Sequence, residues 1–183
     1  MSADRPSVLV TAASRHGATL EIAEHLARSL EQSAAGLRCG LVATSIPVER
    51  RPDPVRYDAV ILASAVYAGR WLEPAAHYAA EHAAALRARP VWLLSSGPIG
   101  EPPFPPDEPY DVEPLRSLLG ARAHRVFAGR LDKHLLGVGE RAMVTAMRAP
   151  LGDFRDWEAL RAWAEEIAEE VAVAALGAPA VPS

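Results

Sequence analysis

Apolar runs alternate with amphipathic segments along most of this chain, and this alternation constrains the fold more than any other feature. Residues 7–13, 58–66 and 90–96 are short, mostly apolar runs, as expected for strands buried on both faces of a sheet. Residues 20–35 and 157–176 instead repeat apolar side chains at helical spacing. Strands that alternate with helices predict an α/β fold with a parallel sheet and right-handed crossovers.

Weaker patterns complete the expected order of elements. They predict two more strands, at residues 37–44 and 121–131, and three more helices, at residues 74–86, 114–120 and 134–148. We expect Gly36 to end the first long helix and Asp156 to cap the last one. Five strands in 183 residues fit a flavodoxin-like three-layer sandwich, with a parallel sheet in the order 2-1-3-4-5 and helices on both faces. We expect one domain over residues 1–183, with a core at about 7–176 and a flexible tail at 177–183.

Composition excludes several classes of partner. The net charge is -4 and no run rich in Lys or Arg is present, so we expect no nucleic acid partner. Cys39 is the single cysteine, so no disulfide can form within the chain. The N-terminus lacks the pattern of a signal peptide, and no apolar run approaches the roughly 20 residues that cross a bilayer. These features predict a cytoplasmic protein, and the use of Arg in place of Lys suggests a GC-rich bacterial genome.

A sheet of this kind predicts where a ligand binds. In open α/β sheets the site lies beyond the carboxyl ends of the strands, at the point where the strand order reverses. With the order 2-1-3-4-5 this point lies between the first and third strands. The loops at residues 14–19, 64–71 and 95–100 are therefore the candidate site.

The first of these loops has the chemistry of a phosphate site. Its residues are Ser14, Arg15, His16, Gly17, Ala18 and Thr19. A turn that enters a helix directs unpaired N–H groups outward, and the helix dipole favours an anion there. Gly17 allows close approach of the backbone, and the hydroxyls of Ser14 and Thr19 can donate hydrogen bonds. The alternative is an ordinary capped turn.

The other two loops suit the edge of a flat ring. The candidate residues are Val66, Tyr67, Ala68, Gly69 and Arg70 in the second loop, and Ser95, Ser96 and Gly97 in the third. Tyr67 can stack beside a conjugated ring, and Arg70 can stabilise negative charge or pair with a substrate carboxylate. Plain turns are the alternative. A phosphate loop with two ring-edge loops beside it predicts FMN as the cofactor.

Several motifs resemble one family. SRHGATLEIA, VILASAVYAGRW, VFAGRLD and DWEALRAWAEEIA are similar to segments of the flavodoxin-domain family that includes the menaquinone-dependent protoporphyrinogen dehydrogenases of bacteria, over roughly residues 7–172. The resemblance implies an FMN-dependent oxidoreductase that passes electrons from a reduced organic substrate, of which a protoporphyrinogen is one candidate, to a quinone-type acceptor. Arg15, His16 and Ala18 depart from the hydroxyl-rich phosphate loop of ordinary flavodoxins. Residues 132–157 carry less charge and fewer aromatic residues than the matching segment of the porphyrinogen enzymes.

Two other functions stay open. The chain could be an electron carrier that relays electrons between redox proteins, or a binding domain of the same fold that has lost its flavin. A proline-rich loop at residues 101–114 favours the enzyme, because it would cover the flavin. The sequence shows no metal-ligand motif and no nucleophile motif. The helix at residues 134–148 leaves homodimer formation open.

Overall fold

The computed structural model of the chain describes residues 5–97 and 112–177. The strands are β1 (Ser7–Ala13), β2 (Val42–Pro47), β3 (Ala59–Tyr67), β4 (Arg70–Trp71), β5 (Val91–Ser96), β6 (Ala123–Phe127), β7 (Arg130–Leu131) and β8 (Gly152–Asp153). The α-helices are α1 (Ala18–Gln32), α2 (Ala34–Cys39), α3 (Glu73–Glu81), α4 (Ala83–Arg87), α5 (Val112–Leu119), α6 (Val138–Ala146) and α7 (Trp157–Gly177), and two short 3₁₀ helices span Val48–Arg50 and Pro54–Arg56.

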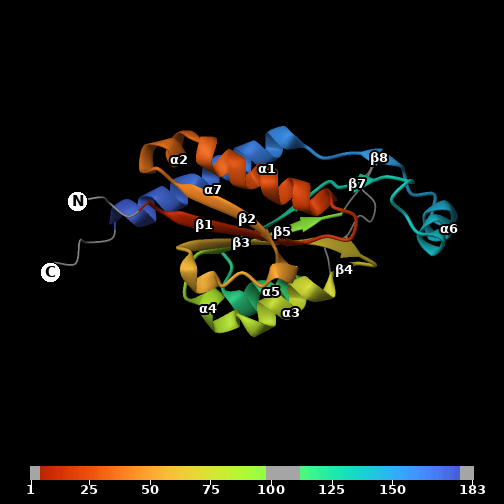
Figure 1. Ribbon diagram of the computed structural model, residues 1–183, viewed down its shortest axis with the longest axis horizontal. Coiled ribbons are helices and arrows are strands. Elements are labelled where there is room, and N and C mark those ends of the chain that lie inside the picture. Colours follow the sequence, from red (N-terminus) through yellow and green to blue (C-terminus); the bar gives the residue numbers. More distant parts are fainter. Residues whose placement is uncertain (1–4, 98–111, 178–183) are drawn as a thin grey trace.

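The main sheet is parallel and runs in the order β2-β1-β3-β5-β6. Counted in chain order, these long strands have the predicted order 2-1-3-4-5, so the flavodoxin-like fold is confirmed. The two-residue strand β4 adds an antiparallel pair to the end of β3. Figure 1 shows α1, α2 and α7 over one face of the sheet and α3, α4 and α5 over the other.

Each face of the sheet has its own apolar core. On one side, Ile22 and Leu26 of α1 pack with Trp163 and Ile167 of α7. On the other side, Tyr78 and other buried side chains of α3, α4 and α5 cover alternate residues of the same strands. Because β1, β3 and β5 are covered on both faces, their sequences are apolar at nearly every position. This explains why these strands could be predicted from the sequence.

The prediction that Gly36 ends the first helix was wrong. Ser33 adopts an extended conformation and its hydroxyl accepts a hydrogen bond from the Gly36 amide, so a second helix, α2, begins directly. A Cβ at Gly36 would collide with the carbonyl oxygen of Leu30, which shows that this glycine allows close packing. Gly40, in the left-handed conformation at φ +67°, ends α2. The strand predicted at residues 37–44 therefore begins only at Val42.

Other predicted boundaries also shift. The helix expected at residues 74–86 is two helices that meet at His82, whose backbone leaves helical geometry. The strand expected at residues 121–131 divides into β6 and β7. Asp156 caps α7 as predicted, because its carboxylate accepts from the amides of Glu158 and Ala159. The proline-rich loop lies almost wholly outside the described residues.

Between β6 and α7 the chain forms an extension that is separate from the main sheet. β7 and β8 pair as a small antiparallel sheet, and between them lies a segment that we call the cap, residues 132–151, which contains α6. Figure 1 shows α6 beyond the end of the main sheet, apart from the two helical layers. None of the residues of α6 is buried. Among the described residues, no helix is long and apolar enough to cross a membrane.

Candidate functional site

A pocket of about 390 Å³ lies at the carboxyl ends of the central strands, between these ends and the cap. Its walls come from the loops after β1, β3, β5 and β6 and from the cap. The lining residues are Ser14, Arg15, His16, Ala18, Thr19, Ala65, Val66, Tyr67, Ala68, Gly69, Ser96, Gly97, Gly129, Arg130, Leu131, Met143, Val144, Met147 and Ala149.

The structure brings most of the predicted site residues together in this pocket. All three predicted loops contribute to its walls. Gly17, Arg70 and Ser95 are not among the lining residues. Gly17 shapes the first loop, Arg70 is exposed at the start of β4, and Ser95 is buried beneath the third loop.

The first loop leaves the start of α1 open. Gly17 is left-handed at φ +86°, and its amide donates to Ser14 Oγ at 3.0 Å. The first hydrogen bond of the helix ladder runs from Glu21 N–H to the carbonyl of Gly17, so the preceding amides of α1 have no partner within the helix. No described side chain caps this end. An uncapped helix start beside a pocket can bind an anion.

The second loop is a tight hairpin that fixes Tyr67. Tyr67 pairs with Arg70 across a two-residue turn, in which Ala68 and Gly69 have φ values of +48° and +74°. Two successive positive φ values are typical of a type I′ turn. Ala68 is strained there, since an L-residue in this conformation costs roughly 1–2 kcal/mol. Strain of this kind is common at ligand-binding loops.

The third loop rests on a buried polar chain. Ser95 Oγ accepts a hydrogen bond from Trp71 Nε1 at 2.8 Å and lies 2.8 Å from His124 Nε2. The Ser95 hydroxyl is therefore used to join β5 to its neighbours beneath the pocket. Ser96 and Gly97 are the residues of this loop that reach the pocket.

Glu140 of the cap is bound by both of the first two loops. Its Oε1 accepts from Tyr67 Oη at 2.8 Å and lies 2.9 Å from Arg15 Nε and 3.2 Å from His16 Nε2. Its Oε2 accepts from the Gly137 amide at 2.8 Å. The Gly137 amide, the Tyr67 hydroxyl and His16 lower the pKa of Glu140 to about 2, so the carboxylate is ionised at neutral pH.

Tyr67 is held in its protonated form. Burial, followed by the hydrogen bond to Glu140, raises the pKa of Tyr67 to about 12. The guanidinium of Arg15 lies over the Tyr67 ring, with 4.6 Å between its central carbon and the ring centroid. Arg15, one of the residues of the candidate phosphate loop, is paired with Glu140 of the cap in the structure.

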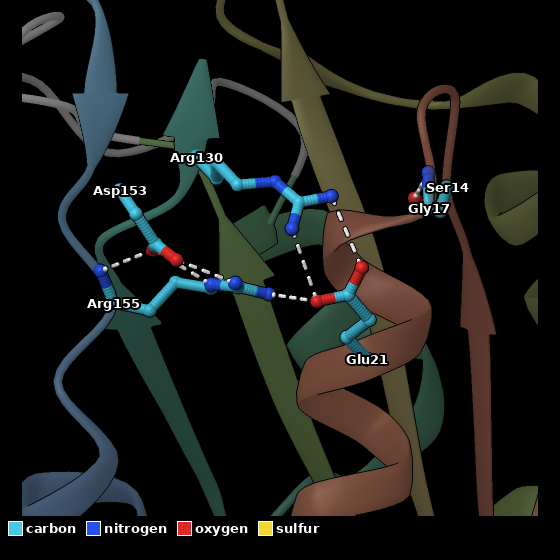
Figure 2. Close-up of polar contacts among 6 residues, drawn as sticks. All are labelled: Ser14, Gly17, Glu21, Arg130, Asp153 and Arg155. Carbon is cyan, nitrogen blue, oxygen red and sulfur yellow. Dashed lines mark hydrogen bonds and ion pairs between the residues drawn. The ribbon is translucent and has the colours of Figure 1, made fainter. Parts of the chain in front are cut away.

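A second set of charges joins the extension to α1. Figure 2 shows Arg130 of β7 and Arg155 both reaching Glu21 in the first turn of α1. Arg130 donates to Glu21 at 3.0 and 3.2 Å, and Arg155 donates to Glu21 and to Asp153 at 2.6 Å each. Arg155 lowers the pKa values of Glu21 and Asp153 through these hydrogen bonds. The base of the extension is thus fixed beside the helix start that faces the pocket.

Comparison with protein families identifies this architecture. A family model described as a flavodoxin domain matches residues 9–157. The chain belongs to the flavodoxin domain family. Membership implies a flavin cofactor, typically FMN, and electron transfer as the general class of function. No curated protein matches the chain significantly.

Solved structures agree with this flavodoxin domain at the level of the fold. A flavodoxin from the domain Archaea is 14% identical with a TM-score of 0.60, and the match covers 90% of this chain and 98% of that one. Flavodoxin 1 from Bacillus cereus is 12% identical with a TM-score of 0.56, over 89% and 97% of the two chains. Rubredoxin oxygen:oxidoreductase from Desulfovibrio gigas is 14% identical with a TM-score of 0.60, and 95% of this chain covers only 38% of that one.

Sequence reasoning missed one side of the pocket of this flavodoxin domain. Gly129, Arg130 and Leu131 follow the last long strand, whose carboxyl end lies at the same edge of the sheet as the three predicted loops. The parallel topology alone could have added this fourth loop. Glu140 and the pocket-lining residues of the cap had no comparable signal, because their contacts join segments more than 70 residues apart.

Proposed function

We propose that this flavodoxin domain binds FMN in the pocket and passes electrons from a reduced organic substrate to a quinone-type acceptor. One observation carries the proposal: the uncapped start of α1 opens into the same pocket as the Tyr67 ring. An anion site at one end and an aromatic side chain at the other suit a cofactor with a phosphate and a flat ring.

Different residues of the pocket would bind the two ends of FMN. The amides at the start of α1, with the hydroxyls of Ser14 and Thr19, would hold the phosphate. Tyr67 and the turn at Ser96 and Gly97 would lie against the ring. When bound, FMN supplies the redox chemistry, and the protein supplies position and electrostatics. Arg70 is exposed outside the lining, so any role for it requires a ligand that extends beyond the pocket.

The cap favours an enzyme over a simple carrier. Met143, Val144 and Met147 form a wall of the pocket, which would restrict access to a ring bound there. Restricted access suits a small substrate, of which a protoporphyrinogen is one candidate. The carrier stays the second proposal, because the cap also exposes apolar side chains that a redox protein could cover: Val138 is 87% exposed and Met147 is 52% exposed.

The visible absorption spectrum of the purified protein tests the cofactor. We expect a yellow protein, or one that becomes yellow when FMN is added and the excess is removed. A colourless protein that takes up no FMN would contradict both proposals and favour a flavin-free domain. Reduction of a soluble quinone by the substrate-reduced protein supports the enzyme, whereas exchange only with a redox protein supports the carrier. Gel filtration tests whether the chain forms a homodimer, which the helix expected at residues 134–148 left open.

Gly17→Asp tests the location of the phosphate. The new carboxylate would stand at the helix start, and the φ of +86° strains any L-residue there. We expect FMN affinity to fall at least tenfold, as measured by flavin fluorescence quenching. Gly17→Ala is the matched control, since a Cβ at this position meets nothing within 4 Å and introduces the strain without the charge. Equal affinities for Gly17→Asp and Gly17→Ala would show that the phosphate binds elsewhere.

A further inference from the structure

Three hydrogen-bonding groups from residues that line the pocket converge on a single carboxylate oxygen. Arg15 Nε, His16 Nε2 and Tyr67 Oη all lie within 3.2 Å of Glu140 Oε1. Because Glu140 is ionised at neutral pH, His16 Nε2 must carry a hydrogen and donate it. One guanidinium, one imidazole and one phenol directed at one oxygen make a strong site for a carboxylate.

The donors and the carboxylate differ in how firmly they are held. Arg15 and His16 belong to the loop between β1 and α1, and Tyr67 ends β3, so all three are attached to the central sheet. Glu140 belongs to α6, which has no buried residue. An element with so little buried surface opens at low cost in free energy. The strand and the loop that carry the donors can therefore stay in place when Glu140 leaves.

The donors also face the space in which a ligand would bind. Arg15, His16 and Tyr67 all line the pocket, although Glu140 does not. Apolar side chains that do not belong to α6, those of Val66 and Leu131, contribute to the remaining walls. A ligand that fits both features has an apolar body and a carboxylate.

We propose that Arg15, His16 and Tyr67 form a receptor for the carboxylate of a small-molecule substrate, and that Glu140 occupies this receptor until the substrate displaces it. Entry of the substrate then releases α6 from the two loops. The proposal rests on the proposed function, because it names the substrate class of the same pocket. It assigns the receptor to the substrate because the proposed function places the phosphate of FMN at the start of α1.

Benzoate is a suitable probe, since it joins an apolar ring to a carboxylate, and benzamide is its uncharged control. We expect benzoate to bind Glu140→Gln about tenfold more tightly than the wild type, because the competing charge is gone. Adding Tyr67→Phe to Glu140→Gln removes one donor and should weaken benzoate binding about tenfold again. Glu158→Gln, an exposed substitution on α7, should bind benzoate as the wild type does. Titration calorimetry measures all four proteins.

Hydrogen exchange in the wild-type protein gives an independent test that needs no substitution. We expect benzoate, but not benzamide, to speed exchange of the amides at residues 138–146. The proposal is overturned if benzamide binds as well as benzoate, if Glu140→Gln gains no affinity, or if benzoate leaves the α6 amides unchanged. It is also overturned if FMN alone releases α6, because the receptor would then serve the cofactor. Failure of FMN binding is seen separately in the absorption spectrum, and the benzoate titrations are done with and without FMN.

Discussion

At the scale of single residues, Glu140 gives the unusual phosphate loop a partner from a distant part of the chain. The ion pair with Arg15 is half exposed on the Arg side, and such pairs contribute about 0–1 kcal/mol. The hydrogen bond from Tyr67 to an ionised acceptor is worth about 1.5–3 kcal/mol. Tyr67 is therefore the stronger tie between the cap and the loops, and Arg15 adds charge complementarity.

The phenol of Tyr67 should report directly on this contact. Its pKa of about 12 has burial as the main cause and Glu140 as the second. We expect Glu140→Gln to lower the Tyr67 pKa while leaving it above 10, because the burial remains. Phenolate absorbance measured against pH gives the value, and Tyr67→Phe identifies the signal among the four tyrosines. An unchanged titration in Glu140→Gln would show that the hydrogen bond does not form in solution.

At the scale of elements, α6 is held by one polar cluster where other helices are held by a core. α7 buries Leu160, Trp163 and Ile167 against the sheet, whereas α6 buries none of its residues. Its attachment to the two loops therefore depends on the charge of Glu140. This makes the position of α6 sensitive to pH.

Exchange of the α6 amides should show that sensitivity. The folded pKa of Glu140, about 2, is below its ordinary value of 4.5, so the contact stabilises the closed cap above pH 4.5 and is lost as pH falls through about 2. We expect Glu140→Gln to exchange several-fold faster than the wild type at pH 7 and at the same rate near pH 2. The ratio of the two rates, measured by mass spectrometry, cancels the intrinsic effect of pH on exchange. A constant ratio across this range would exclude Glu140 as the pH-dependent group.

The second attachment of the extension is made by Arg155. Its side chain is 6% exposed, lies between Glu21 and Asp153, and stacks on the Trp157 ring at 4.6 Å. Arg155→Leu leaves two carboxylates without this partner, and we expect it to lower the free energy of unfolding by about 1–3 kcal/mol. Arg38→Leu is the control, because the Arg38–Glu169 pair is exposed and its loss should cost less than about 1 kcal/mol. Urea unfolding measures both, and equal losses would contradict a special role for Arg155.

The elements that could be predicted from the sequence are those whose pattern is set by burial. Runs of apolar residues predict β1, β3 and β5, and a stripe of apolar residues at helical spacing predicts α7. The break at Ser33 depends on side-chain hydrogen bonds, in which Ser33 and the distant Glu165 accept from the first amides of α2. These bonds compete with helix propagation without altering the apolar pattern. The attachment of the cap to the two loops depends on the contacts of Glu140 with His16 and Tyr67. No local sequence pattern indicates these contacts.

At the scale of the whole molecule, the central sheet forms one side of the pocket and the extension between β6 and α7 forms the other. The sheet carries the loops after β1, β3 and β5, and cores on both faces fix the positions of those strands. The cap, whose helix α6 lies beyond the end of the main sheet in Figure 1, supplies one wall of the pocket. A ligand that fills the pocket contacts both parts and should therefore stabilise the folded chain as a unit.

The stabilisation should depend on the phosphate of the ligand. A ligand that binds only the folded state at 100 times its Kd adds about 2.7 kcal/mol, which for a chain of this size raises Tm by roughly 5–10 °C. We expect this rise with FMN and a much smaller one with riboflavin at the same concentration, since riboflavin has the ring but no phosphate for the start of α1. In Gly17→Asp the advantage of FMN should disappear, because the helix start no longer accepts an anion, while Gly17→Ala should retain it. Scanning calorimetry of the three proteins with each ligand makes the comparison. Equal rises with FMN and riboflavin in the wild type would mean that the ring alone binds and that the turn at residues 14–19 holds no phosphate.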